Sequence, residues 1–295
     1  MTPAAAYAAC LRLARSHYEN FPVASWLMPR DARPHIAAVY AFARMADDVA
    51  DEGTSPEPVR LAELDRWQAR LDAAAEGRVL PTGDEAIDAT SVALAETLRH
   101  FGPARMHALL SDLLSAFRQD VVQRRYTSWS ELLDYCRRSA NPVGRLVLII
   151  CGYDDEALRQ KSDAVCTALQ LTNFWQDLEI DWSRGRLYVS QDVVDAHHAH
   201  TGDLDRRIWS PQWRDALEDC GLRTRRLFED GRGVADGVRG RLRWELRATW
   251  LGGMRILHRL AEADYDVFRG RPTLSRRDVP AVIGGAVSWR PRPQA

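Results

Sequence analysis

The sequence predicts an all-α protein with a single domain over residues 1–288, followed by a Pro- and Arg-rich tail at 289–295 that we expect to be disordered. Apolar residues recur at intervals of three and four along most of the chain, as they do on one face of a helix. No stretch shows the alternation of apolar and polar residues that indicates a strand. No linker, internal repeat or shift of composition divides the 295 residues into two parts.

Short stretches rich in Gly, Pro, Ser or Asp divide the chain into about eight to ten expected helices. Cap residues mark the starts of three of these helices: Asp31, Ser128 and Asp154. We expect the helix after Asp154 to continue to near Trp182. The predicted breaks are residues 20–34, 53–58, 77–84, 101–103, 141–144, 152–155 and 183–192.

The composition narrows the class of function. A net charge of -1 gives no electrostatic reason to expect a nucleic-acid partner. The five cysteines are widely spaced and form no CxxC pair, so they predict neither a disulfide framework nor a zinc site, and a reducing cytoplasm fits them best. The longest apolar run, residues 146–151, is far too short to cross a bilayer, and the N-terminus does not have the pattern of a secretion signal.

One polar stripe lies in the segment "VYAFARMADDVADE" at residues 39–52. Tyr40, Arg44, Asp47 and Asp51 share a helix face because residues three and four apart are neighbours on a helix. Two carboxylates one turn apart repel each other, more strongly where water does not screen them. The stripe is therefore either a solvent face, with Arg44 supplying part of the compensating charge, or a site for a bound cation.

A second stripe lies in "LQLTNFWQDLEIDWSRGRLY" at residues 169–188. Gln170, Asn173, Asp177 and Asp181 follow one another at spacings of three, four and four on an otherwise apolar helix. For either helix alone a solvent face is the simpler interpretation. Two stripes that each end in Asp-x-x-x-Asp, 130 positions apart, favour the lining of a polar cavity.

Two such acidic pairs facing each other predict a Mg²⁺ site, because Mg²⁺ is held by one or two carboxylates, waters and substrate phosphate. A metal-bound diphosphate in an apolar cavity suggests loss of diphosphate from an apolar substrate, which leaves a carbocation. Arg184 and Arg186, on either side of Gly185, can reach the same anion. Aromatic rings near the stripes can face the cation, although each can equally be ordinary core; they are Phe21, Tyr40, Tyr135, Phe174 and Trp175.

Other chemistries lack their sequence signals. No histidine has a Glu three positions before it, as di-iron carboxylate bundles require. The chain has no GxGxxG, GxxxxGK[ST] or GxSxG motif, so the signals of dinucleotide, P-loop and serine-hydrolase sites are absent.

These stripes and their surroundings resemble the squalene and phytoene synthase family of head-to-head isoprenoid enzymes. The resemblance is carried by "NFPVASWLMP" (20–29), "VYAFARMADDVADE" (39–52), "YCRRSANPVGR" (135–145), "LQLTNFWQDLEIDWSRGRLYVSQD" (169–192) and "YDVFRGRP" (265–272). It implies an all-α isoprenoid-synthase bundle with a central active-site cavity and three Mg²⁺ ions that bind the diphosphate.

The resemblance also implies roles for particular residues. Asp47, Asp51, Asp177 and Asp181 correspond to the family's metal-binding aspartates, with Asn173 as a further metal ligand. Tyr40, Arg44 and Tyr135 are expected to line the cavity as catalytic residues. The expected substrate-binding residues are Glu19, Asn20, Phe21, Asn141, Gln170, Phe174, Gln176, Arg186 and Tyr188.

Departures from the family pattern point to one branch of it. Glu19 stands where the family usually has Lys or Arg, and Gln176 stands where it usually has Arg, so two phosphate-facing cations are lost. The chain looks most like the hydroxysqualene synthase branch of bacterial hopanoid pathways, which converts presqualene diphosphate and water to hydroxysqualene and diphosphate. This implies no use of NADPH, a water oriented by Glu19, Asn20 or Asn141, and a cytoplasmic enzyme that can contact the inner face of the membrane peripherally.

Two alternatives stay open. One is a head-to-head prenyl synthase that makes presqualene diphosphate, squalene or a carotenoid precursor from farnesyl diphosphate, against which Glu19 argues. The other is a non-catalytic helical scaffold, against which the two intact acidic pairs argue.

Overall fold

A computed structural model describes residues 1–16, 27–51 and 55–290. Within these ranges the secondary structure is helical, with fifteen α-helices, one 3₁₀ helix and no β-strand, so the predicted all-α fold is confirmed. The described helices outnumber the eight to ten expected because four of them have six residues or fewer. None of the helices in these ranges combines the length and the apolar character needed to cross a bilayer.

Contacts within the chain define two units. The first takes in residues up to Val122 together with Pro142–Asp155, and the second takes in Gln123–Asn141 and the chain from Glu156 onward. The first acidic stripe therefore belongs to the first unit and the second stripe to the second unit.

Helix α2 is the central helix of the first unit. It packs against four other helices of that unit. Ala37, Ala38, Ala41 and Ala46 are fully buried on it, and such small side chains let the neighbouring helices approach closely. The helices of this unit are α1 (Pro3–Ser16), α2 (Arg33–Asp51), α3 (Glu57–Ala75), α4 (Glu85–Phe101), α5 (Pro103–Val122) and most of α7 (Asn141–Ile150).

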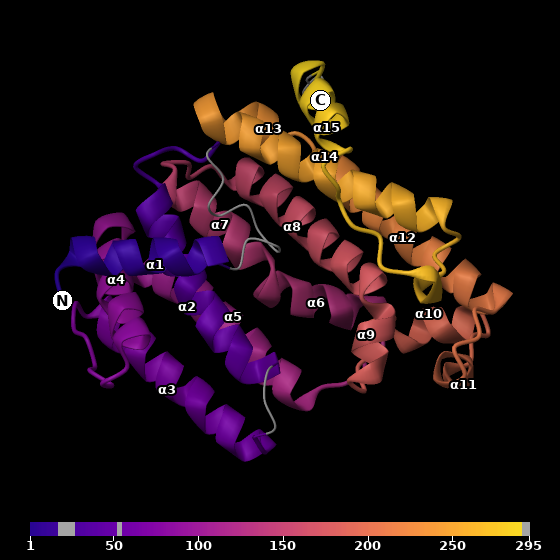
Figure 1. The fold of residues 1–295 in the computed structure, drawn as a ribbon, viewed down its shortest axis with the longest axis horizontal. Coiled ribbons are helices and arrows are strands. Elements are labelled where there is room, and N and C mark those ends of the chain that lie inside the picture. The colour runs from indigo at the N-terminus through magenta and orange to yellow at the C-terminus, as the bar shows by residue number, and fades with distance from the viewer. Residues whose placement is uncertain (17–26, 52–54, 291–295) are drawn as a thin grey trace. The chain divides into compact units, whose positions relative to one another are not determined.

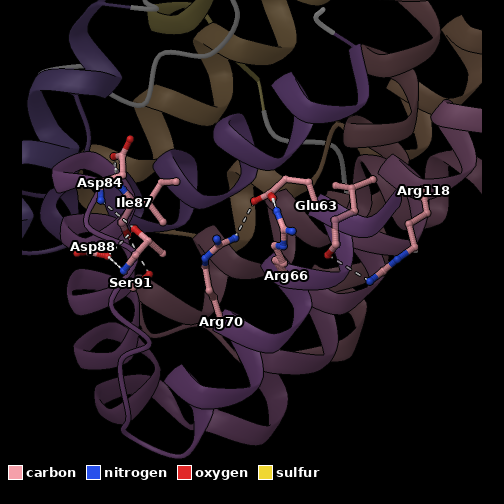
Figure 2. Close-up of polar contacts among 10 residues, drawn as sticks. Glu63, Arg66, Arg70, Asp84, Ile87, Asp88, Ser91 and Arg118 are labelled. Carbon is pink, nitrogen blue, oxygen red and sulfur yellow. Dashed lines mark hydrogen bonds and ion pairs between the residues drawn. The ribbon is translucent and has the colours of Figure 1, made fainter. Parts of the chain in front are cut away.

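The predicted breaks around α4 are confirmed by its ends. Asp84 caps the N-terminus, where its carboxylate accepts hydrogen bonds from the backbone N–H groups of Ala86 (2.9 Å) and Ile87 (3.0 Å). Figure 2 shows this cap beside Asp88. At the other end Gly102 has a φ of 99°, which ends the helix, and Pro103 begins α5.

Polar contacts fix α5 against α3. Arg118 of α5 donates to the Asp65 carboxylate (3.0 Å) and to the Leu64 carbonyl oxygen (3.3 Å). Glu63 accepts from Arg66 and Arg70 on the same stretch of α3 (Figure 2). These contacts set the position of the C-terminal half of α5, which carries Asp120.

Three long helices, α8, α12 and α14, form the body of the second unit, and α8 packs against both of the others (Figure 1). The Ser128 hydroxyl caps α6 by accepting from the Glu131 N–H, as predicted. The helices are α6 (Trp129–Ser139), α8 (Glu156–Gln176), α9 (Leu178–Ser183), α10 (Gln191–Ala196), α11 (Thr201–Asp205), α12 (Pro211–Gly231), α13 (Val234–Gly237), α14 (Gly240–Glu262), η2 (Val267–Arg269) and α15 (Val279–Val287).

Glycines at two helix contacts allow this close packing. A Cβ atom at Gly231 of α12 would lie 2.6 Å from the Lys161 carbonyl oxygen of α8. A Cβ atom at Gly253 of α14 would lie 2.6 Å from Phe228 and 2.7 Å from Leu169. Only glycine fits these contacts without displacement, so both positions help to set the place of α8, which carries the second stripe.

The packed chain extends past the predicted domain boundary at residue 288. Trp289 is buried, its indole N–H donates to the Asp236 carboxylate (3.0 Å), and its ring meets that of Trp250 edge-on. Trp289 thus packs on the second unit, one position beyond the predicted boundary, and residues 291–295 of the predicted tail lie outside the described residues.

Candidate active site

Asp47 on α2 is an acid whose charged form is disfavoured by its surroundings. Burial, with the negative charges of Asp51 and Asp120, raises its pKa from the ordinary 3.8 to about 7. About a third of its side chain (36%) still reaches solvent, so the carboxylate is recessed rather than sealed. A bound cation would relieve the repulsion within this group of acids.

The Arg44 guanidinium lies closer to the Asp48 carboxylate than to the Asp47 carboxylate. Its Nη2 lies 2.5 Å from the Asp48 Oδ1, whereas its Nη1 lies 4.0 Å from the Asp47 Oδ2. The expectation that Arg44 supplies part of the charge opposite Asp47 is thus met only weakly. Tyr40, one turn before Arg44 on the same face, is half-buried, and burial raises its pKa.

Asp120 on α5 is an acidic residue that sequence reasoning missed. It is 5% exposed, and its charge contributes to the raised pKa of Asp47. The signal was present in the sequence, because Asp120 follows Leu113, Leu114 and Phe117 at the spacing of the buried face of a helix.

The second stripe does not lie on one continuous helix. Helix α8 ends at Gln176, the backbone bends at Asp177 (φ −100°, ψ 10°), and α9 begins at Leu178, so the predicted uninterrupted helix to near Trp182 is wrong. Backbone hydrogen bonds nevertheless bridge the bend. The Asp177 N–H donates to the Asn173 carbonyl oxygen (2.9 Å) and the Asp181 N–H to that of Asp177 (2.8 Å), so the four-residue repeat persists.

The Asp177 carboxylate accepts hydrogen bonds from two side chains. The Asn173 amide donates to its Oδ2 (2.9 Å), and Arg271 donates to both oxygens, with its Nη2 3.1 Å from Oδ2. The side chain of Asp177 is 17% exposed and that of Arg271 39%. Arg271 lies in the stretch "YDVFRGRP" that carried the family resemblance, although the sequence assigned it no role.

Four aromatic rings of the second unit form a buried cluster, and three of them, Tyr135, Phe174 and Tyr188, were predicted site residues. Phe174 and Tyr188 stack with centroids 3.7 Å apart, and Tyr135 lies 6.1 Å and 6.0 Å from them. Tyr126 completes the cluster, 5.6 Å from Tyr135 and 5.7 Å from Tyr188. The sequence did not predict Tyr126.

Backbone hydrogen bonds fix the loop after α9, which carries Tyr188 of the aromatic cluster. The Leu187 N–H donates to the Arg124 carbonyl oxygen (3.0 Å), and the Gln191 N–H donates to that of Tyr126 (2.9 Å). Arg186 is buried in this loop at 6% exposure. Pairing with residues 124–126 thus sets the places of Tyr126, Tyr188 and Arg186 together.

Two predicted substrate-binding residues take part in structural hydrogen bonds. The buried Gln176 donates from its amide to the Pro272 carbonyl oxygen (2.6 Å). The Asn141 Oδ1 accepts from the Thr167 hydroxyl (2.9 Å) inside the second unit. Gln170 is half-buried on α8. Glu19, Asn20 and Phe21 lie outside the described residues.

The donor set of each acidic pair suits Mg²⁺. Carboxylate and amide oxygens are the hard ligands that this ion prefers. In the part of the chain that the structure describes, no three His, Cys, Asp or Glu side chains converge closely enough to hold a metal ion by themselves. Each unit supplies one pair of carboxylates, Asp47 with Asp51 and Asp177 with Asp181, and Mg²⁺ commonly completes its shell with water and substrate phosphate.

Together these features define an all-helical protein with one Asp-x-x-x-Asp pair in each unit and a buried aromatic cluster. Residues 14–278 match the model of the squalene/phytoene synthase family. The chain belongs to this family. It is 38% identical over 275 residues to hydroxysqualene synthase from Zymomonas mobilis, covering 92% of this chain and 86% of the relative. It is also 38% identical over 257 residues to the enzyme of the same name from Rhodopseudomonas palustris, covering 86% and 84%.

Solved structures agree with this assignment. The squalene synthase HpnC from Alicyclobacillus acidocaldarius has a TM-score of 0.80 and 36% sequence identity, covering 88% of this chain and 95% of that one. A dehydrosqualene synthase has a TM-score of 0.85 over 97% of both chains, at 21% identity, and this likeness supports the fold alone.

Proposed function

We propose that this chain is a hydroxysqualene synthase, which converts presqualene diphosphate and water to hydroxysqualene and diphosphate. The observation that carries the proposal is the 38% identity with two hydroxysqualene synthases over most of their length. Phytoene synthase from Synechococcus elongatus is more distant, at 28%. Glu19 and Gln176 support the same assignment, because they replace cations that an enzyme binding two prenyl diphosphates would use.

Each acidic pair has a role in the first step, the loss of diphosphate. When bound, Mg²⁺ neutralises the charge that develops on diphosphate as the C–O bond breaks and the electron pair leaves with the oxygen. Asp47 and Asp51 of α2 would hold the ion in the first unit, and Asp177, Asp181 and Asn173 would hold it in the second.

The aromatic cluster serves the second step, in which the cation rearranges and water captures it. The ring faces of Tyr135, Phe174 and Tyr188 attract positive charge without offering a nucleophile that would trap the cation early. The water oxygen then forms the new C–O bond and loses a proton. Glu19, Asn20 and Asn141 are the candidates for orienting that water.

The long hydrocarbon product has to leave for a bilayer. We therefore also propose that the enzyme contacts the membrane peripherally, at the inner face of the cytoplasmic membrane.

Incubation of the purified protein with Mg²⁺ and either presqualene diphosphate or farnesyl diphosphate tests the proposal. The organic extract, analysed by mass spectrometry, should contain hydroxysqualene from the first substrate only. Asp51→Ala and Asp177→Ala should each abolish turnover while circular dichroism stays unchanged, and Asp230→Ala, an exposed position on α12, is the control. Squalene or a carotenoid precursor from farnesyl diphosphate would contradict the proposal, as would full activity in both aspartate variants.

A further inference from the structure

Helix α15 exposes a continuous apolar stripe. Val279, Ile283 and Val287 follow one another four residues apart, which places them on one face. Their exposed fractions are 50%, 58% and 67%. The nine residues of the helix include no charged side chain. Single exposed apolar residues are common on protein surfaces, but a whole helix face of them marks a surface that binds something.

The opposite face of α15 is fixed to α14, so the stripe cannot turn inward. Ala286 is buried, and a Cβ atom at Gly285 would lie 3.1 Å from Leu251 of α14. The Arg247 guanidinium of α14 donates to the Ala286 carbonyl oxygen (3.0 Å). Figure 1 shows α15 as the short yellow helix at the C-terminal end, beside α14.

The segment that carries α15 is cationic at its surface. Residues 271–290 contain four arginines and one acid, Asp278. Asp278 is 4% exposed and accepts hydrogen bonds from the Ser275 N–H (2.7 Å) and from Arg259 of α14 (2.6 Å). The negative charge of Asp278 is thus buried and paired within the protein. The side chains of Arg276 and Arg277, just before the helix, are exposed.

A tryptophan lies near the other end of the stripe. Trp244 of α14 is 40% exposed, and the Arg247 guanidinium that holds Ala286 also lies 5.2 Å from the centroid of the Trp244 ring. Indole rings favour the boundary between acyl chains and headgroups, because one end is apolar and the other donates a hydrogen bond.

We propose that the apolar stripe of α15, with Arg276, Arg277 and Trp244, is a docking surface for an anionic phospholipid bilayer. The stripe would enter the acyl boundary and the arginines would meet lipid phosphates, the pattern of a helix that lies in the membrane interface. A nine-residue helix is too short to span a bilayer. The absence of exposed acids from residues 271–290 favours a negatively charged surface over a mixed-charge protein partner. The proposal deepens the peripheral contact inferred above and rests on α15 rather than on the reaction.

Co-sedimentation of the full chain with vesicles tests this surface without any substrate, so its outcome is independent of the proposed reaction. The protein should bind vesicles of phosphatidylcholine with phosphatidylglycerol more tightly than vesicles of phosphatidylcholine alone, and raised salt should weaken the binding. Arg276→Gln combined with Arg277→Gln should weaken the binding by about twenty-five-fold, which corresponds to about fivefold for each arginine lost. Ile283→Asp should weaken it by about tenfold or more.

Two control variants test whether the loss of vesicle binding is specific to the surface of α15. Val59→Asp replaces a residue of α3 with nearly the same exposure as Ile283, 55% against 58%, and should bind as the wild type does. Arg12→Gln with Arg15→Gln removes two exposed arginines of α1 as a control for charge alone. Circular dichroism confirms folding. The proposal is overturned if the wild type does not bind anionic vesicles. It is equally overturned if Ile283→Asp binds these vesicles as tightly as the wild type does. It is also overturned if sedimentation without vesicles shows a dimer that Ile283→Asp abolishes.

Discussion

Arg271 donates hydrogen bonds to both oxygens of the Asp177 carboxylate, across 94 positions of sequence. A planar guanidinium matches a carboxylate in this two-bond arrangement. The carboxylate that we assign to Mg²⁺ is therefore also paired with a protein cation. We expect Arg271 and Mg²⁺ to compete for Asp177.

Arg271→Gln should therefore tighten the binding of Mg²⁺ alone. The variant removes a cation that competes for Asp177, and charge-assisted hydrogen bonds of this kind contribute roughly 1.5–3 kcal/mol, less where solvent screens them. We expect the Kd for Mg²⁺, measured by isothermal titration calorimetry without substrate, to fall by about threefold to tenfold.

Arg269→Gln is the matched control. Arg269 is two positions away, is largely exposed and pairs with Asp266 at 2.9 Å. It should leave the Kd for Mg²⁺ unchanged. A weaker or equal affinity in Arg271→Gln would show that the arginine does not compete with the ion.

Asp47→Asn should stabilise the metal-free protein, more at pH 8 than at pH 5. The folded pKa of Asp47 is raised to about 7 from 3.8, so the folded state binds a proton that the unfolded state lacks between about pH 4 and pH 7. Stability therefore falls as pH rises through this window, and the repulsion is complete above it. With EDTA present, thermal unfolding of the variant should shift up by ~2 °C at pH 8.

Asp48→Asn provides the comparison for that experiment, because Asp48 is paired with Arg44 at 2.5 Å. It should not raise the Tm at either pH. If Asp47→Asn lowers the Tm at pH 8, the assignment of Asp47 as a carboxylate in need of a cation is wrong.

Gly231→Ala should destabilise the second unit. The added Cβ atom would lie 2.6 Å from the Lys161 carbonyl oxygen, and backbone cannot move aside as a flexible side chain can. Overpacking of this kind costs roughly 1–3 kcal/mol, measurable by urea unfolding. Gly202→Ala on α11, where the new Cβ meets nothing within 4 Å, should be neutral or slightly stabilising. Equal stability of the two variants would contradict the close contact between α12 and α8.

Phe174→Leu should lower kcat by about tenfold if its ring stabilises the cation, since such contacts contribute roughly 0.5–2 kcal/mol. Single-turnover kinetics with presqualene diphosphate measure the step directly. Phe42→Leu removes a buried ring that packs on Trp67 in the first unit, and it controls for loss of stability alone. If kcat is the same in Phe174→Leu and in the wild type, Phe174 is an ordinary core residue that does not stabilise the cation.

The sequence was informative where local periodicity decides the structure. The all-α class, the helix break at Gly102 and Pro103 and the cap at Ser128 depend on short-range chemistry, which the sequence shows directly. The sequence names Tyr135, Phe174 and Tyr188 as separate site candidates, and the structure places their three rings in contact. Their role in the reaction stays a prediction.

Features that depend on long-range contacts could not be predicted. The pairing of Arg271 with Asp177 and the placing of Tyr126 beside Tyr188 join residues far apart in the chain. The bend at Asp177 has no Pro or Gly to mark it. The resemblance places Gln176 among the substrate contacts, whereas its amide donates to the Pro272 carbonyl oxygen, a partner that no local pattern reveals.

The most direct test of the proposed function is the reaction of presqualene diphosphate with the Mg²⁺-loaded protein in water enriched in oxygen-18. We expect hydroxysqualene whose hydroxyl carries the heavy isotope, because solvent water captures the cation. A hydroxyl without the label, or a hydrocarbon as the only product, would contradict the proposed reaction.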